Sequence, residues 1–359
     1  MSAIPKRSSL VAQVVELLRD DLRAGRWREF LPGETALCDQ LHVSRKTLRA
    51  ALQVLEREGL IASSQGQRRR ITKSIRRRGS VKSNLVAWFA PDPLHTLSEF
   101  MLLYVAELRR RLQEAGYALQ IVPSPPSSPH PEAALENTVR QHHAACWVLV
   151  HSSSQVQRWF WERNILCLLS GAAHKGIELP SIATDHRAVC RHAVGVFLHH
   201  GHRGIAFVTP RSDLAGNLAS EQSFREGLPT GVAARVIHHN STVDGIRSSL
   251  DAVFAGKDRP TGLLVSYPEH VLTVLSYALS AGLRIPQDLS LISRDYDYFL
   301  DHLYPSVAHY EFDHRLYAAR LARLVVQLAA TGFLPRRATW VMPEFRSGGT
   351  LAALSVHAP

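Results

Sequence analysis

Residues 31–71 read LPGETALCDQLHVSRKTLRAALQVLEREGLIASSQGQRRRI, and this stretch decides the fold of the N-terminal part of the chain. Two helical patterns, residues 34–41 and 44–58, are separated by only two residues, which forces a tight turn between them. The hydroxyl of Ser44 can accept a free backbone N–H at the start of the second helix. Gly59 can end that helix, because glycine adopts left-handed backbone angles easily. The stretch therefore predicts a helix-turn-helix.

The start of the second helix carries side chains that suit DNA. Arginine and lysine donate hydrogen bonds to phosphates and to the guanine edge, and hydroxyl groups donate to phosphates. The candidates here are Ser44, Arg45, Lys46, Thr47 and Arg49. The alternative is an ordinary amphipathic surface helix whose charges are solvated, and a helix-turn-helix pattern alone leaves that alternative open.

A hairpin pattern follows the second helix. Residues 60–63 and 69–72 are short strand patterns on either side of a glycine-containing turn, which is the arrangement of a wing. Its tip adds four candidates for DNA contact, namely Gln65, Gly66, Gln67 and Arg68. Upstream, residues 8–24 form an amphipathic pattern that predicts a helix packed under the other two. Because these features occur in order, we predict a winged helix-turn-helix DNA-binding domain over residues 1–73.

The net charge of the chain is concentrated in the same region. Residues 1–82 contain 18 basic and 8 acidic residues, a net charge of 18 − 8 = +10, whereas the remainder contains 42 − 18 = 24 basic and 31 − 8 = 23 acidic residues, a net charge of +1. This asymmetry is typical of a nucleic-acid-binding module joined to a body with another task. Residues 74–83 are expected to form a basic linker, whose charge would add salt-dependent affinity for DNA.

The composition excludes several protein classes. The chain has 359 residues, 45% of them hydrophobic, and no run of about 18 apolar residues that a membrane span requires. No secretory signal pattern is present, so we expect a cytoplasmic protein. The four cysteines are isolated and are expected to be buried thiols. Nineteen histidines invite a metal hypothesis, but no acidic or cysteine partner completes a ligand set, so no metal and no cofactor are expected.

From residue 84 the pattern changes to strands that alternate with helices. Such alternation predicts an α/β fold with doubly wound parallel sheets, and the repeat of the pattern predicts two similar lobes. The expected strands are residues 85–89, 117–122, 146–150, 165–169, 181–184, 205–209, 236–238, 262–265 and 290–293. The expected helices include residues 97–112, 132–141, 188–200, 221–227, 245–255, 271–281 and 316–330.

The N-terminal motifs resemble a known family. LPGE, VSRKTLRAALQVLEREGLI and QGQRRRI are similar, from end to end, to the GntR-type winged helix. The resemblance implies binding to a double-stranded DNA operator. Two positions depart from the family pattern, which usually has an arginine in place of Thr35 and a second glycine in place of Arg68. The operator sequence is therefore expected to differ from that of relatives.

The rest of the chain resembles a second family. SIATDHRAVCRHAVGVFLHHGHRGIAFVTP, PTGLLV, VLSYALSAGLRIPQDLSLISRDYD and RSGGTL are similar to the LacI/GalR-type regulator sensor, which is built like a type I periplasmic binding protein. The resemblance implies a ligand-sensing domain over residues 84–359, with lobe one at about 84–185 and 310–336 and lobe two at about 188–306 and 340–357. The chain would cross between the lobes near residues 184–187, 307–310 and 335–340.

In such a fold the ligand lies between the lobes, against loops at the carboxyl ends of strands. On that ground the candidate effector-binding residues are Asp92, His151, Ser152, Asp185, Tyr267, Arg294 and Asp295, although Asp92 and His151 are better explained as solvated loop residues. By resemblance, Asp295 matches an acidic residue that often meets the ligand. The family's arginine falls on Ser220 and its Asn-Asp pair falls on Tyr267-Pro268, so a monosaccharide effector is in doubt.

An enzyme is the alternative class. GntR-type winged helices are also found fused to aminotransferase-like bodies, which need a lysine that forms a Schiff base with pyridoxal phosphate. Beyond Lys82 the chain has only Lys175 and Lys257, and neither lies in a pocket motif. No P-loop, GxSxG or HExxH motif is present. We therefore expect a transcriptional repressor rather than an enzyme, acting as a homodimer on an operator under the control of a small-molecule effector.

Overall fold

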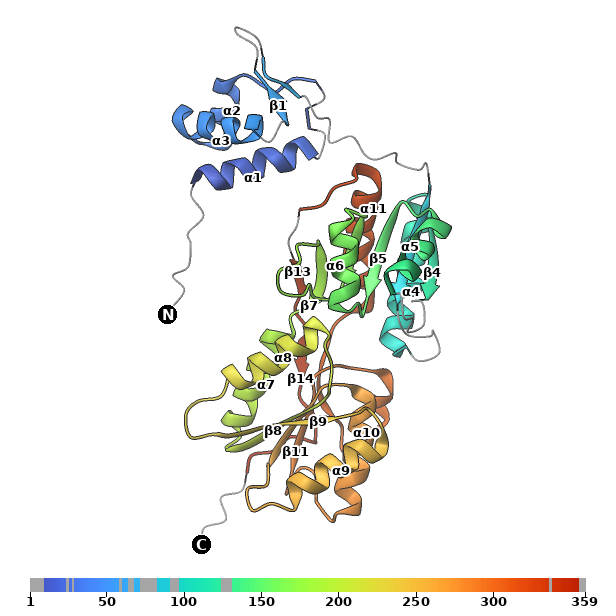
Figure 1. Cartoon of the computed structure of the whole chain (residues 1–359). Helices are drawn as coiled ribbons and strands as arrows, with labels where there is room; N and C mark the ends of the chain where they lie inside the picture. The colour runs from blue at the N-terminus through green and yellow to red at the C-terminus, as the bar shows by residue number, and fades with distance from the viewer. Residues whose placement is uncertain are drawn as a thin grey trace. The chain divides into compact units, whose positions relative to one another are not determined.

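The computed structural model describes residues 10–23, 26–27, 29–57, 60–63, 68–71, 83–90, 97–123, 131–335 and 338–354. The chain divides into two compact units, one formed by residues 1–83 with 327–335 and the other by the remaining residues. Each unit is described by itself below, and Figure 1 shows the elements of both.

The N-terminal unit contains the predicted helix-turn-helix. Helices α1 (Leu10–Arg23), α2 (Glu34–Leu41) and α3 (Arg45–Arg57) precede an antiparallel pair of short strands, β1 (Ile61–Ala62) and β2 (Arg70–Ile71). Their apolar faces form one core, because the α1 stripe of Val14, Val15, Leu18 and Leu22 is buried together with Leu37, Leu48, Leu52, Leu55 and Ile61.

The tight turn between α2 and α3 has the expected chemistry. His42 ends α2 in the left-handed conformation, with φ of 52°. The Ser44 hydroxyl accepts a hydrogen bond from the backbone N–H of Thr47 at 3.2 Å, so Ser44 caps α3 as predicted. The cap fixes where α3 begins and therefore which side chains its first turn presents.

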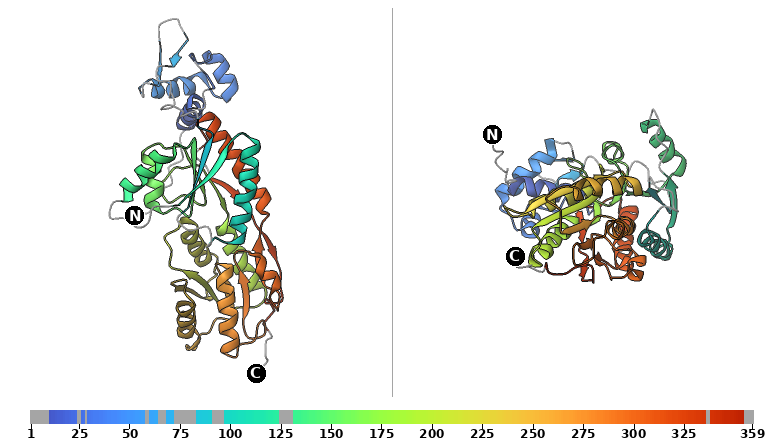
Figure 2. Two further views of the ribbon diagram at one scale, coloured as in Figure 1. Left: turned by 90° about the vertical axis from the view of Figure 1, so that its right-hand side faces the viewer. Right: turned by 90° about the horizontal axis from the view of Figure 1, so that it is seen from below.

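The larger unit contains two six-stranded sheets. The first has the order β13-β7-β6-β5-β3-β4, and all its strand pairs are parallel. Its strands are β3 (Leu85–Ala90), β4 (Ala118–Pro123), β5 (Cys146–Val150), β6 (Cys167–Ser170), β7 (Ser181–Thr184) and β13 (Ala338–Val341). Its helices are α4 (Glu99–Glu114), α5 (Pro131–His142), α6 (Ser154–Glu162) and α11 (His314–Thr331). Figure 2 shows α4 and α11 beside one another, where the rings of Tyr104 and Tyr317 lie 5.2 Å apart.

The second sheet has the order β14-β12-β11-β10-β8-β9, parallel except for β14. Its strands are β8 (Gly204–Pro210), β9 (Ala233–His239), β10 (Gly262–Val265), β11 (Ser290–Ser293), β12 (Ala308–Glu311) and β14 (Glu344–Arg346). Helices α7 (His186–His199) and α8 (Ala215–Glu226) pack on one face, and α9 (Val243–Phe254) and α10 (Pro268–Ser280) pack on the other. Both faces are apolar because a parallel sheet is covered on both sides.

Two of the three lobe crossings lie later in the sequence than expected. The first crossing, between β7 and α7, is where it was predicted. Strand β12 pairs with β11, however, so the chain returns to the first lobe only after Glu311 rather than at 307–310. Likewise β13 pairs with β7, so the last crossing follows Val341 rather than lying at 335–340. Helix α8 also begins at Ala215, where only a helix end at 221–227 was expected.

Candidate nucleic-acid interface and ligand cleft

The predicted recognition helix presents its basic residues on the surface. Ser44, Arg45, Lys46 and Arg49 are exposed in and just before the first turns of α3, and Thr47 is half-buried. Arg45 donates to the Thr35 hydroxyl at 3.4 Å, and the Nε of Arg49 donates to Glu34 at 2.8 Å. Both arginines are thus held by residues at the start of α2, which restricts the directions in which their guanidinium groups point.

Glu34 is the centre of an ion-pair chain that joins the wing to the helices. Besides Arg49, it accepts from Arg69 at 2.9 Å, and Arg69 also donates to Glu56 of α3 at 3.0 Å. The hydrogen bond from Arg49 lowers the pKa of the Glu34 carboxyl, with Arg69 adding to the effect against a smaller opposing contribution from burial. Because Arg69 directly precedes β2, these ion pairs connect the base of the wing to α2 and α3.

The tip of the wing lies outside the described residues. Gln65, Gly66 and Gln67 therefore stay predictions, as does the role of Gly59 at the end of α3. Arg68 is described, is exposed and lies two residues before β2, next to Arg69.

A cavity of about 860 Å³ lies between the two lobes of the larger unit. Residues from both lobes line it, including His151, Ser152 and Tyr104 from the first and Asn217, Tyr267, Arg294 and Asp295 from the second. This is the position predicted for a ligand, at the carboxyl ends of the parallel strands.

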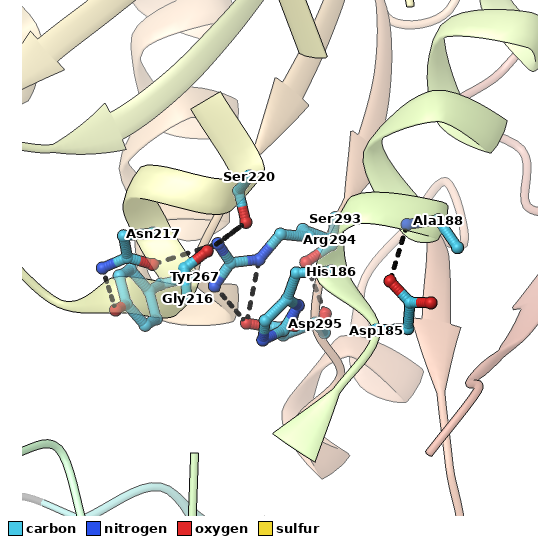
Figure 3. Close-up of polar contacts among 10 residues, drawn as sticks. All are labelled: Asp185, His186, Ala188, Gly216, Asn217, Ser220, Tyr267, Ser293, Arg294 and Asp295. Atoms are coloured by element: carbon cyan, nitrogen blue, oxygen red, sulfur yellow. Dashed lines mark hydrogen bonds and ion pairs between the residues drawn. The ribbon is translucent and has the colours of Figure 1, made fainter. Parts of the chain in front are cut away.

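Arg294 organises the second-lobe wall of this cleft (Figure 3). Its guanidinium is only 2% exposed and donates to Asn217 and Ser220, both at 3.1 Å, and to Asp295 at 2.7 Å. Its Cζ also lies 5.3 Å from the centre of the Tyr267 ring. Its Nε donates to Asp295 as well, at 3.3 Å, so four of the five guanidinium N–H groups are engaged within the protein and Arg294 mainly positions the groups around it.

Asp295 is held ionised by its neighbours. Burial raises the pKa of a carboxyl, but the charge of Arg294 and its hydrogen bond to Asp295 outweigh this effect and keep the pKa of Asp295 below its ordinary value. The Nδ1 of His186 lies 3.7 Å from Asp295. Burial, reinforced by the charge of Arg294, lowers the pKa of His186 to about 4, so the imidazole is neutral at pH 7. The cleft thus offers one carboxylate beside a neutral histidine.

The first-lobe wall of the cleft is aromatic. The cavity is lined by Phe100, Tyr104, Phe312 and Tyr317, whose rings pack edge to face or tilted against one another with centres 4.5 to 6.1 Å apart. The Tyr317 hydroxyl bonds to Ser170 at 2.9 Å and to the Ile182 carbonyl at 3.2 Å. Because this hydroxyl is occupied, Tyr317 contributes mainly ring surface to the cleft. The two walls therefore differ, one aromatic and one polar.

The predicted effector residues do not all reach the cavity. Tyr267, Arg294 and Asp295 line it, as do His151 and Ser152. Asp185 instead caps α7, its Oδ1 accepting the Ala188 N–H at 3.0 Å. Ser220 is fully buried behind Arg294, and Asp92 lies outside the described residues. Neither Asp185 nor Ser220 is among the residues that line the cavity.

Sequence reasoning missed Asn217, His186 and the aromatic wall. Asn217 stands three residues before Ser220, so both lie on one face of a helix, but that helix was not predicted to extend so far. His186 directly follows the Asp185 that was singled out. The aromatic residues come from α4 and from residues 312–317, two segments that only the fold brings together.

Comparison with known proteins agrees with this geometry. Residues 10–71 match the model of bacterial regulatory proteins of the gntR family, and residues 194–351 match that of a periplasmic binding protein-like domain. The chain therefore joins a gntR-type DNA-binding domain to a periplasmic binding protein-like domain. The combination is the one predicted from the sequence.

Individual relatives are distant. Catabolite control protein A of Priestia megaterium is 25% identical over 133 residues, which are 36% of this chain and 40% of that protein, so the match spans well under half of either. The structure of a LacI family regulator from Bifidobacterium animalis subsp. lactis covers 76% of this chain and 99% of its own, at a TM-score of 0.64 and 18% identity. The regulator CelR in complex with cellobiose covers 96% of this chain and all of its own, at a TM-score of 0.66 and 15% identity. These likenesses establish the fold.

Among the described helices none has the length and apolar content needed to cross a membrane. The described residues also contain no group of three or more histidine, cysteine, aspartate or glutamate side chains arranged to hold a metal ion. Three of the four cysteines are buried as expected, whereas Cys38 is only partly buried.

Proposed function

We propose that this chain is a repressor whose affinity for its operator is controlled by a small molecule bound between the two lobes. The observation that carries the proposal is the cavity of about 860 Å³, lined from both lobes and supplied with Arg294, Asp295 and an aromatic wall. A cavity of this size and mixed character is typical of a small-molecule site. The winged helix with its exposed arginines supplies the DNA-binding output.

Movement of the lobes is the means of control in this proposal. A direct hydrogen bond already spans the mouth of the cleft, since Asp297 of the second lobe accepts the backbone N–H of Glu99 of the first at 3.1 Å. A ligand that binds one lobe arrangement more tightly than another shifts the population toward it. The ligand then changes the free energy of operator binding, and the operator changes the free energy of ligand binding by the same amount.

The DNA contacts are assigned to α3 and the wing. Arg45, Lys46 and Arg49, with Ser44 and Thr47, would meet one major groove, and Gln65, Gly66, Gln67 and Arg68 would meet the adjacent backbone or groove. Operators with two-fold symmetry are matched by dimeric proteins, so we assign a homodimer. The exposed Leu102 and Leu103 of α4 offer apolar surface that a second copy could cover. Sedimentation at several protein concentrations tests this assignment, and a strictly monomeric chain bound to DNA would contradict it.

The residues of the cleft indicate which classes of effector to test. A neighbour of the same fold was solved as a complex with cellobiose, and aromatic rings present flat apolar surface on which a sugar can rest. Thermal unfolding of the full chain against sugars, sugar acids, sugar phosphates and nucleosides tests for a ligand, because a specific ligand of the folded state raises the unfolding temperature. A hit that is lost in Asp295→Asn but retained in the surface variant Asp288→Asn supports the cleft as its site. Retention in both would place the ligand elsewhere.

An aminotransferase-type body is not favoured. Both the domain model and the solved neighbours correspond to binding-protein folds. Lys175 is exposed in a loop, as is Lys257, and neither lines the cleft.

A further inference from the structure

One end of the cleft is built differently from the Arg294 wall. Between the N-termini of α9 and α10 the cavity is lined by Arg211, Ser241, Val243, His270 and Thr273. The two helices lie side by side in the second lobe (Figure 1). Both helices are longer than eight residues. At α9 the Thr242 hydroxyl accepts the Gly245 N–H at 3.0 Å, whereas the first two N–H groups, those of Val243 and Asp244, lack acceptors within the helix. Tyr267, which precedes α10, makes no side-chain cap there.

A buried histidine pair lies at this end. His270 is 6% exposed and His239 is 3% exposed, and their ring centres are 4.6 Å apart with perpendicular planes. The Nδ1 of His239 accepts the backbone N–H of Ser241 at 3.1 Å, so the proton of the neutral ring is on Nε2. Neither that Nε2 nor the Nδ1 of His270 has a hydrogen-bond partner among the described residues. Buried polar groups normally have partners, so this pair leaves hydrogen-bonding capacity unmet next to the cavity that His270 lines.

The surrounding charges favour an acceptor-rich group. The backbone N–H of Arg211 is bonded to the His239 carbonyl at 2.9 Å, which places this arginine beside the pair, and its side chain forms no ion pair with any residue that the structure describes. Glu269 also lines the cavity, but the charges that act on its pKa, after burial, are those of Asp295, Asp297 and Arg294. Burial lowers the pKa of His270 to about 4, so its imidazole is neutral at pH 7.

We propose that this end of the cleft is an anion subsite, which binds a phosphate or carboxylate group of the effector through His270, Arg211 and the N-terminus of α9. His239 acts behind His270 as a positioning residue. His270 supplies a neutral N–H donor, Arg211 supplies charge, and the start of α9 supplies backbone N–H groups that lack acceptors within the helix. This inference rests on the proposed function of the cleft and narrows the effector to a ligand with an anionic end, such as a sugar phosphate or a sugar acid.

The test uses the full chain with histidine labelled by 15N, and inorganic phosphate or acetate as the probe at constant ionic strength. The variants His270→Gln and His239→Gln assign the two imidazole signals by their loss. We expect phosphate to shift both signals saturably. A shift with phosphate alone would indicate a phosphate-bearing effector, and a shift with acetate as well would extend the subsite to carboxylates. Signals that move with neither probe would overturn the proposal.

A second variant separates this subsite from phosphate bound elsewhere on the basic chain. Arg211→Gln changes an exposed side chain, so the fold should be retained, and the midpoint of the phosphate-induced shifts should rise about tenfold because a charge-assisted contact is lost. Arg259→Gln, which alters another exposed arginine of the second lobe, is the matched control and should leave the midpoint unchanged. An unchanged midpoint in Arg211→Gln would contradict the subsite. Operator binding is measured on the same proteins. A variant that loses phosphate binding but keeps operator binding, or the reverse, shows which of the two proposals is wrong.

Discussion

At the scale of single residues, Arg49 is the side chain on which DNA binding should depend most clearly. Glu34 holds its Nε at 2.8 Å, which leaves the two terminal nitrogens of the guanidinium for DNA. Arg49→Ala should weaken operator binding by about 1–3 kcal/mol, the cost of a lost base contact. Arg57→Ala, in the last turn of the same helix, is the control and should have little effect. Equal losses in both variants, measured by fluorescence anisotropy, would mean that the recognition surface is assigned wrongly.

Glu34 gives the winged helix a defined pH dependence. The pKa of this carboxyl is lower in the folded state than in the unfolded chain, because Arg49 and Arg69 bind the ionised form. Its contribution to stability is therefore present above the unfolded pKa and is lost as the pH falls through the folded value. The unfolding temperature should fall less steeply on acidification in Glu34→Gln than in the parent chain. If the unfolding temperatures of the two proteins fell in parallel between about pH 5 and pH 3, Glu34 would not be the source of this pH dependence.

Arg294 should be a stability determinant as well as a cleft residue. Its removal leaves the Asp295 carboxylate in the cleft wall without its main partner, and breaking a buried pair in this way costs about 3–5 kcal/mol. Arg294→Ala should lower the free energy of unfolding, measured with urea, by a large fraction of that amount. The surface pair of Arg284 with Asp288 provides the control, and Arg284→Ala should change stability by less than about 1 kcal/mol. Similar effects in both variants would contradict the assignment.

At the scale of secondary structure, the helix caps separate structural residues from ligand-binding ones. Asp185 was predicted to meet the effector, but its carboxylate accepts the Ala188 N–H at the start of α7. Asp185→Ala should therefore cost about 1 kcal/mol of stability, the usual value of a lost cap, and Asp185→Asn should retain most of it. Ligand affinity should be unchanged in both. A large loss of ligand affinity in Asp185→Asn would restore the original prediction.

Most elements were predictable because their signals are local. The helices of the winged unit follow from an apolar stripe, a serine cap and a short joint, and β5, β7, β10 and β11 are short apolar runs bounded by polar residues. Strands β12, β13 and β14 were not predicted, because each owes its place in a sheet to pairing with another strand that its local sequence does not reveal. For the same reason, two of the lobe crossings lie later in the sequence than predicted.

The cleft was only partly predictable for the same reason. Tyr267, Arg294 and Asp295 follow directly after strands or lie at their ends, where the fold rule places ligand contacts. The partners of Arg294 could not be read from the sequence, because Asn217 and Ser220 lie more than 70 residues away on α8. The histidine pair likewise joins β9 to α10 through packing alone.

At the scale of the whole molecule, control of DNA binding by a small molecule requires two sites that influence one another. The winged helix carries the basic surface and the larger unit carries the cleft, so binding at either site must change affinity at the other by the same factor if they are coupled. No coupling follows if a ligand binds all lobe arrangements equally well. The domain limits of 1–73, 74–83 and 84–359 remain predictions that limited proteolysis can test.

The most direct test measures operator affinity with and without a saturating cleft ligand, using an operator selected from random duplex DNA and a ligand found by thermal unfolding. We expect the ligand to change operator affinity, and the operator to change ligand affinity by an equal factor. Both effects should be lost in Asp295→Asn, while DNA binding itself persists. An operator affinity that is identical with and without saturating ligand would contradict the central claim.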